Sequence, residues 1–355
     1  MSTVLTLKKL RIAVVGAGVI GLSAALHITE KFPDMVQVHL IADKFTPDTA
    51  SDLTGMILWP FDLSEELKES ERDSGESEYQ ENMKKWTRET FAKFHSIYRS
   101  EVNAEIQICL RTGYLTCYED AHDPWWKECV FGFRRVNPKS TEAITANAPP
   151  ACTELWAFTT YIVDCSNYMR WMMKEFLTNC GTIIKRKIES LNELSTYDIV
   201  VNCTGMRAGN LVEEHDMKPC RGQGLLVKAP WISAFIVDEI GLDLTYIIPR
   251  ADTVVLGGTA EIGNASEEPD SSTTQGILER CFKLNPSLRK AQILGGWSGL
   301  RPLRSRVRLD TETGPTGSVV IHCYGHGGQG VVLSWGCAKD IGDIVQKQYR
   351  KQANL

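Results

Sequence analysis

Three glycines near the start of the chain have the spacing of a nucleotide-binding turn. Gly16, Gly18 and Gly21 form the pattern G-x-G-x-x-G between a β-branched run at 11–15 and a helical pattern of apolar residues. Gly16 permits the tight turn, Gly18 lets the backbone approach a pyrophosphate, and Gly21 lets the helix pack closely on the sheet. A second strand-like run ends at Asp43, where an acceptor for a ribose hydroxyl is expected. The pattern predicts a site for an ADP-containing dinucleotide, either NAD or FAD.

A second glycine-rich loop lies near the end of the chain. The sequence YGHGGQG at 324–330 runs into an apolar, helix-like stretch from Val331. The free N–H groups of a helix start and the positive end of its dipole attract anions. The loop is therefore a second predicted anion site, in a chain that already has a phosphate-binding turn at its beginning.

The composition is that of an ordinary globular enzyme. A chain of 355 residues can bury a large core and usually forms two domains. The net charge of −5 argues against nucleic acid as the main partner, and no apolar run is long enough to span a bilayer. The start of the chain lacks the apolar core and cleavage site of a secretory signal. The 11 cysteines show neither C-x-x-C pairs nor Cys/His alternation, so we expect reduced, buried thiols and no metal site.

Strand and helix patterns alternate along the chain. The runs 183–188 and 198–203 predict strands, and the second of these is expected to be buried, parallel and to end on the ligand side of the sheet. The stretch 245–263 predicts an antiparallel hairpin with its turn at 249–252. The acidic stretch 62–86 predicts a solvated loop or an exposed helix. An antiparallel part is therefore expected to be inserted into a doubly wound α/β part.

A set of motifs in one order carries a family resemblance. They are VVGAGVIGLSAAL, FTPDTASD, DIVVNCTG, CRGQ, LTYIIP, GLRPLRSRVRL and YGHGGQGVVLSWGCA. Over nearly the whole chain, 10–345, the sequence resembles the D-amino-acid oxidase and D-aspartate oxidase family. NAD dehydrogenases with the same glycine fingerprint do not share the last three motifs. The resemblance implies non-covalent FAD and oxidative deamination of a D-amino acid with O₂ as electron acceptor.

The resemblance also assigns residues to the cofactor. It places the 324–330 loop beside the pyrimidine end of the flavin, where the reduced ring gathers negative charge that the helix start stabilises. The residues that it implies for FAD binding are Gly16, Ala17, Gly18, Val19, Ile20, Gly21, Asp43, Lys44, Ala50, Ser51, Met56, Ile188, Thr204, Gly205, Gly327, Gly328, Gly330, Val331 and Val332.

Three residues are implied to bind the substrate. Arg301 matches the family arginine whose planar fork holds the α-carboxylate, Tyr246 matches the tyrosine that adds a hydrogen bond, and the carbonyl of Gly328 accepts a bond from the α-amine. The flavin supplies the reactivity, so no acid–base pair is required, and His326 is expected to structure its loop. The implied products are a 2-oxo acid, ammonia and H₂O₂.

Indications of the substrate side chain conflict. The short lid at 241–246 and the FTPDTASD motif resemble D-aspartate oxidases, and on that ground we favour D-aspartate or D-glutamate. Where such enzymes usually have arginines and a serine, this chain has Val237, Ala260 and Gly328. Those residues favour neutral or broad D-amino acids, because a buried carboxylate without a partner is costly. Arg250 is a substitute partner in one interpretation, but we expect it instead to be a solvent-exposed hairpin charge.

Two other classes of protein share parts of this pattern. A glycine or sarcosine oxidase would have the same fold and FAD, and turnover of N-methylated or achiral amines would distinguish it. A non-catalytic nucleotide-binding protein would have the first glycines but no reason to combine them with Arg301, Tyr246 and the flavin loop.

The predicted fold is α/β, with a Rossmann-like FAD-binding domain interleaved with an antiparallel α+β substrate-binding domain. The FAD-binding domain is expected to comprise 10–60, 150–208 and 305–345, and the substrate-binding domain 61–149 and 209–304. The last helix is expected to end near Gln348, so that 346–355 form a free C-terminal tail.

The end of the chain predicts a cellular address. Ala353, Asn354 and Leu355 fit the small, polar, leucine form of a peroxisomal signal. We therefore expect a peroxisomal import receptor as a partner and residence in the peroxisomal matrix, or in the cytosol if the tripeptide is not read. Release of H₂O₂ favours the same compartment, beside catalase. The other expected partners are a D-amino acid and O₂, with no nucleic acid and no membrane.

Overall fold

One continuous mixed sheet forms the frame of the molecule. The computed structural model describes residues 9–61, 76–117, 121–140, 142, 152–240, 243–314 and 317–353. Neighbouring strands follow the order β4-β5-β3-β9-β10-β11-β8-β13-β14-β7-β1-β2-β6, and β12 pairs with β8. The strands are β1 Leu10–Val15, β2 Val36–Ala42, β3 Cys109–Cys117, β4 Phe131–Val136, β5 Glu154–Ile162, β6 Thr182–Lys185, β7 Ile199–Asn202, β8 Lys218–Lys228, β9 Phe235–Asp238, β10 Thr245–Pro249, β11 Val254–Gly257, β12 Glu261–Ile262, β13 Gln292–Thr313 and β14 Val319–His326.

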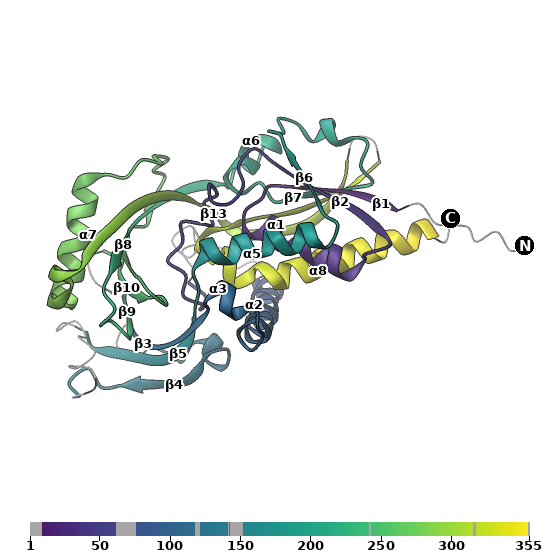
Figure 1. Cartoon of the computed structure of the whole chain (residues 1–355). Coiled ribbons are helices and arrows are strands. Elements are labelled where there is room, and N and C mark those ends of the chain that lie inside the picture. Colours follow the sequence, from purple (N-terminus) through teal and green to yellow (C-terminus); the bar gives the residue numbers. More distant parts are fainter. Residues whose placement is uncertain are drawn as a thin grey trace, which may run out of the picture.

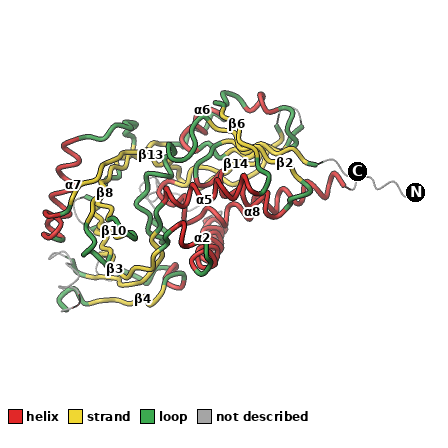
Figure 2. The backbone as a smooth tube through the Cα atoms, viewed as in Figure 1, coloured by secondary structure: helices red, strands yellow, loops and turns green. Residues whose placement is uncertain are grey.

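Helices cover this sheet unevenly. They are α1 Val19–Lys31, α2 Glu76–Tyr98, α3 Asn103–Ile106, α5 Cys165–Thr178, α6 Ala208–Leu211, α7 Ser271–Leu284 and α8 Gly330–Ala353. Figure 2 shows most of the helices on the half of the sheet that contains β2, β6 and β14, and α7 alone at the far side of the other half. Among the described helices, none is both long enough and apolar enough to cross a membrane.

The first half of the sheet is parallel. β14, β7, β1, β2 and β6 all run in one direction, and β7 is buried along its whole length, as expected of a central parallel strand. α1 packs against both α8 and α5, and Figure 1 shows these three helices together over one face of the parallel strands. This half has the Rossmann-like architecture that the glycine fingerprint predicts.

The second half is mainly antiparallel. β10 and β11 form the predicted hairpin, whose turn is closed by a 2.8 Å hydrogen bond from the N–H of Arg250 to the carbonyl of Thr253. α7 covers these strands and buries Ile277, Cys281 and Leu284 in their core. Together with the parallel half, this confirms the predicted α/β fold class with an antiparallel α+β part; the division into residue ranges stays a prediction.

β13 joins the two halves. Its first part pairs with β8 and its last part pairs with β14, with an irregular register between Leu303 and Arg308. Figure 1 shows β13 as the long strand that arches from one half to the other. A residue near the middle of β13, such as Arg301, therefore lies where the two halves of the sheet meet.

Two predictions about the elements were wrong in detail. The strand predicted at 183–188 ends at Lys185. Residues 62–75 of the acidic stretch lie outside the described residues, but the rest of it begins α2, which is not an exposed helix. α2 packs along α8 and buries Met83 and Trp86, because apolar residues recur on one face of this otherwise charged segment.

The last helix is longer than predicted. α8 continues to Ala353 instead of ending near Gln348, since no glycine or proline interrupts its sequence beyond that point. The expected free tail from 346 is therefore helical as far as Ala353. Asn354 and Leu355 lie outside the described residues.

Candidate active site

The first glycine turn has no room for side chains. Gly16 adopts a left-handed φ of 101°, and a Cβ on it would lie 2.3 Å from the carbonyl oxygen of Cys203. A Cβ on Gly21 would lie 1.9 Å from the carbonyl oxygen of Gly16. α1 is thus held against β1 and β7, as the spacing of the fingerprint predicts. Ser51 lies at the same place, because the N–H of Val19 donates to its Oγ at 2.9 Å.

Asp43 directly follows β2, where the fingerprint places a ribose acceptor. Its carboxylate lies 2.7 Å from Nη2 of Arg207, and both side chains are partly exposed. Arg207 was not among the predicted site residues, and its place after the DIVVNCTG motif is the signal that could have identified it.

The second glycine loop places the start of α8 beside the start of α1. Residues 327–329 form a 3₁₀ turn, and α8 begins at Gly330, one residue before the predicted start. Gly325 and Gly327 both have left-handed φ values, which explains the glycines in this loop. A Cβ on Gly330 would lie 3.5 Å from a methyl group of Val19. The first turns of α1 and α8 are therefore neighbours.

These elements enclose a cavity of about 740 Å³, which lies within the usual range for ligand sites. Gly21 does not line it, because this glycine faces the packed turn. The predicted site residues that do line it are Gly16, Ala17, Gly18, Val19, Ile20, Asp43, Lys44, Ala50, Ser51, Met56, Ile188, Thr204, Gly205, Tyr246, Arg301, Gly327, Gly328, Gly330, Val331 and Val332. Residues from distant parts of the chain thus share one cavity, although their individual roles stay predictions.

Arg301 on β13 and Tyr246 on β10 both line this cavity, although β11 and β8 lie between their strands in the sheet. The guanidinium of Arg301 lies over Gly222, where a Cβ would come within 2.4–2.6 Å of it. The ring of Tyr246 lies over Gly257 and Gly258 in the same way. Burial raises the pKa of the Tyr246 hydroxyl, while the charge of Arg301 acts to lower it. The hydroxyl is therefore protonated at neutral pH and able to donate.

Arg301 differs from the other cations that line the cavity. Lys44, Arg186, Lys187 and Arg207 each lie within 4.0 Å of a carboxylate. Among the described residues Arg301 has no carboxylate partner. Its guanidinium makes one hydrogen bond to them, from Nη1 to the carbonyl of Thr259 at 2.9 Å. A partly buried guanidinium without a counter-ion is suited to bind an anionic ligand, and its planar fork suits a carboxylate.

Several bulky apolar side chains line the same cavity as Arg301. Trp59, Phe61, Val237, Leu244 and Ile248 all line the cavity. Trp59 and Phe61 were missed at the sequence level, although they follow the FTPDTASD motif closely. Ala260, which was considered together with Val237, does not line the cavity; it packs on a small cluster with Phe61.

Arg250 is neither solvent-exposed nor available to a ligand, so both interpretations of it were wrong. Its side chain is only 9% exposed; Nη1 pairs with Asp164 at 3.0 Å and Nη2 donates to the carbonyl of Thr54 at 2.8 Å. Asp164 is also the N-cap of α5, so Arg250 ties the β10–β11 turn to that helix. The sequence shows no sign of this partner, which is 86 residues away.

His326 is buried, with 4% of its surface exposed, although it is among the residues that line the cavity. Its Nε2 lies 3.6 Å from the thiol of Cys337 and 3.9 Å from that of Cys323. Burial lowers the pKa of His326 to about 3, so the ring is neutral at physiological pH. The fold thus brings together two thiols and an imidazole that show no metal-site spacing in the sequence. Most other cysteines are buried as expected, but Cys180 is exposed.

The fold and the cavity define a class of protein. A profile of the family described as FAD dependent oxidoreductase (DAO) matches residues 11–344. The chain belongs to this family, and it is an oxidoreductase with FAD as its cofactor. The glycine turn, Asp43 and the second helix start fit this group, since they offer a pyrophosphate site, a ribose acceptor and a second anion site along one cavity.

Particular relatives are similar along nearly their whole length. The chain is 37% identical over 343 residues to the D-aspartate oxidase of Homo sapiens, covering 95% of both chains. It is 35% identical over 338 residues to the D-amino-acid oxidase of Rubrobacter xylanophilus, covering 94% of this chain and 95% of the relative. The glycine oxidase of Geobacillus kaustophilus superposes with a TM-score of 0.76 over 96% of this chain and 95% of that chain; at 15% identity, this shows the fold alone.

Proposed function

We propose that this chain oxidatively deaminates D-amino acids with uncharged side chains, yielding 2-oxo acids, ammonia and H₂O₂. The names of the relatives, D-amino-acid oxidase and D-aspartate oxidase, support D-amino acids as the substrate class. One observation carries the choice of side chain: among the described Lys and Arg residues that line the cavity, Arg301 is the one without a carboxylate partner, and apolar residues such as Val237 and Ile248 line the same cavity. That cation is needed for the α-carboxylate, which leaves no described cation of this cavity free for a second one.

The residues act mainly by placing the substrate. Arg301 binds the α-carboxylate, the hydroxyl of Tyr246 donates to it, and the carbonyl of Gly328 accepts from the α-amine. FAD, when bound in this cavity, would supply the redox chemistry that oxidises the amino acid with O₂ as electron acceptor. The apolar walls exclude water and strengthen the pairing with Arg301. His326 is no base in this scheme, because burial lowers its pKa to about 3, which makes the imidazole a weak proton acceptor.

Peroxide release across a panel of amino acids tests this proposal. D-methionine, D-leucine and D-phenylalanine are compared with D-aspartate, D-glutamate, glycine and sarcosine, and the L-enantiomers are controls. We expect kcat/KM for the apolar D-amino acids to exceed that for D-aspartate by about a hundred-fold or more, since an unpaired buried charge costs roughly 3 kcal/mol. A preference for D-aspartate would overturn the proposal.

D-aspartate oxidation is the second candidate, favoured by the similarity to the human enzyme of that name. A variant with an added cation, with a matched control, tests whether a missing positive charge disfavours D-aspartate. Val237 is paired with Tyr246 in the register of β9 and β10, so both side chains lie on one face of the sheet. Val237→Arg therefore adds a cation beside the site and should narrow the preference for D-methionine over D-aspartate. Val237→Leu controls for size.

Two further features belong to the same proposal. Non-covalent FAD is supported by the family resemblance, and acid precipitation should release the flavin into solution. Peroxisomal import rests on Ala353, Asn354 and Leu355 together with peroxide release. A fluorescent fusion at the N-terminus should form puncta that disperse when Leu355 is deleted, whereas puncta that survive would contradict it.

A further inference from the structure

We propose that Arg221 and Arg280, which lie outside the cavity, are positioning residues for Arg301 and Tyr246. They act through the short segment Gly257–Thr259, which links β11 to β12. This inference rests on the proposed role of Arg301 in carboxylate binding and adds to it the residues that hold the guanidinium in place.

The segment Gly257–Thr259 contacts both substrate-binding side chains. The carbonyl of Thr259 accepts from Nη1 of Arg301 at 2.9 Å. The ring of Tyr246 lies directly over Gly257 and Gly258, where a Cβ would come within 2.1 and 2.5 Å of ring atoms. A shift of this segment would therefore move the carboxylate-binding guanidinium and the phenol together.

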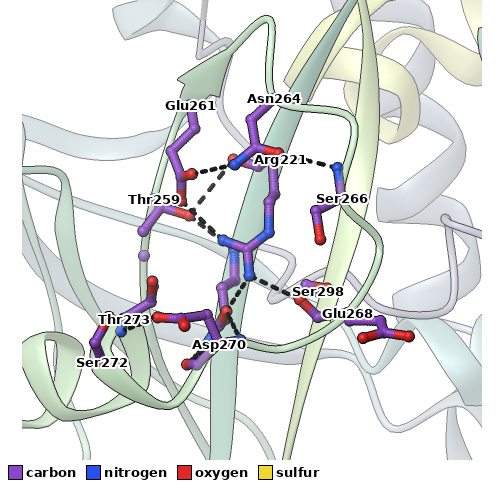
Figure 3. Close-up of polar contacts among 12 residues, drawn as sticks. Arg221, Thr259, Glu261, Asn264, Ser266, Glu268, Asp270, Ser272, Thr273 and Ser298 are labelled. Carbon is purple, nitrogen blue, oxygen red and sulfur yellow. Dashed lines mark hydrogen bonds and ion pairs between the residues drawn. The ribbon is translucent and has the colours of Figure 1, made fainter.

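Arg221 acts on the Thr259 end of the segment through Glu261, which begins β12 two residues after Thr259. Figure 3 shows the guanidinium of Arg221 between the segment with Thr259 and Glu261 on one side and Glu268 and Asp270 on the other. It pairs with Glu261 at 2.8 Å and donates to the carbonyl of Glu268 at 2.9 Å, while its own side chain is 3% exposed. The hydroxyl of Thr259 in turn donates to the carbonyl of Arg221 at 3.4 Å.

Gln223 extends the same network to α7. The backbone N–H of Gln223 donates to the hydroxyl of Thr259 at 3.0 Å. The side-chain oxygen of Gln223 accepts from the guanidinium of Arg221 and from the backbone N–H of Asp270. The side-chain nitrogen donates to the carbonyl of Asp270 and to the hydroxyl of Thr274. Counted as whole residues, with the backbone included, Arg221 and Gln223 are each 2% exposed. Such buried polar groups with several partners give a single geometry, because any displacement leaves some of them unpaired.

Arg280 fixes the other end of the segment from α7. Its Nη2 donates to the carbonyl of Gly258 at 2.9 Å, and its Nε donates to the hydroxyl of Thr245 at 3.0 Å. Thr245 precedes Tyr246 in β10, so this one guanidinium bonds both the side chain of the residue before Tyr246 and the backbone carbonyl of Gly258, over which the phenol lies.

The test compares Arg221→Gln and Arg280→Gln with the parent enzyme, all loaded with FAD. For each, KM and kcat are measured with the preferred D-amino acid, and propionate is used as a competitive monocarboxylate without an amine. We expect KM and the inhibition constant of propionate to rise by the same factor, about ten-fold, with kcat changing less and flavin content unchanged. A merely structural role would not raise both constants equally.

Arg289→Gln is the matched control. Arg289 belongs to the same part of the molecule and lies over the ring of Phe282, 4.9 Å from its centroid, without contact to Gly257–Thr259. Its removal should leave both constants unchanged. Thr259→Val is the second variant if Arg221→Gln does not fold, because it removes the hydroxyl links to Arg221 and Gln223 and keeps the carbonyl that Arg301 uses.

The outcomes separate this inference from the proposed function. If Arg301→Ala raises both constants but neither Arg221→Gln nor Thr259→Val does, the positioning role is overturned and carboxylate binding by Arg301 stands. If Arg301→Ala leaves both constants unchanged, the proposed carboxylate site itself is wrong.

Discussion

Replacing Gly222 with alanine is the sharpest test of where the substrate carboxylate binds. A Cβ at this position would lie 2.4 Å from Nη1 and 2.6 Å from Cζ of Arg301, whereas ordinary contacts begin near 3.4 Å. The guanidinium must therefore move by about 1 Å. Since a misplacement of that size costs roughly a hundred-fold in rate, we expect kcat/KM to fall about a hundred-fold, or about 2.7 kcal/mol.

The same substitution should leave the fold and the cofactor site intact. The three atoms nearest to the new methyl group all belong to the far end of the flexible Arg301 side chain. Flavin content and the thermal unfolding midpoint are measured beside peroxide release, and Gly295→Ala in β13, where a Cβ meets nothing within 4 Å, is the control. Full activity in a folded Gly222→Ala enzyme would refute the assignment of Arg301 to the carboxylate.

Further predictions concern the cofactor site and pH. Asp43→Asn should weaken FAD binding by about ten-fold, through loss of a charge-assisted bond, in fluorescence titrations of the apoprotein. Gly21→Ala should yield little folded protein in solubility and circular dichroism measurements, because its Cβ would overlap the carbonyl of Gly16 at 1.9 Å. Burial lowers the pKa of His326 from 6.5 to about 3. The unfolded chain therefore binds the extra proton between these values, and the stability contributed by neutral His326 is present above pH 6.5 and lost as pH falls. In urea unfolding, this group should make the free energy of unfolding about 2 kcal/mol lower at pH 5 than at pH 7. In His326→Gln the free energy of unfolding should depend less steeply on pH.

The local sequence pattern was sufficient to predict the strand, turn and helix elements at the cofactor site. Gly16, Gly18 and Gly21 work within one turn, and the strand and helix around them have periodic apolar residues that few other structures would satisfy. The same holds for the start of α8, whose glycines carry the left-handed φ values that the loop needs. Both are short-range features, and for such features the sequence alone is informative.

Partners that meet only through the fold could not be predicted. Arg250 was given two roles on the basis of its strand face, but its ion pair with Asp164 depends on how α5 packs beside the β10–β11 turn. Gly222 was part of a recognised motif, CRGQ. Its role in leaving space for the guanidinium of Arg301, however, follows from the pairing of β8 with β13. The end of α8 was misplaced because a terminal helix without a stop signal has no boundary in its sequence.

The two glycine-rich loops are explained by the direction of the helices that follow them. Val19 lies beside Gly330, Ser23 bonds to the carbonyl of Ser334, and Lys31 pairs with Asp343, so α1 and α8 run parallel from a common start. Parallel helices place their positive ends together, an arrangement that repels unless negative charge lies in front of them. FAD supplies such charge twice, in its pyrophosphate and in the flavin ring once this is reduced. The family resemblance predicts that the second loop faces the flavin ring. On that prediction its helix start would stabilise a charge that develops only during the reaction, which contributes to rate rather than to binding.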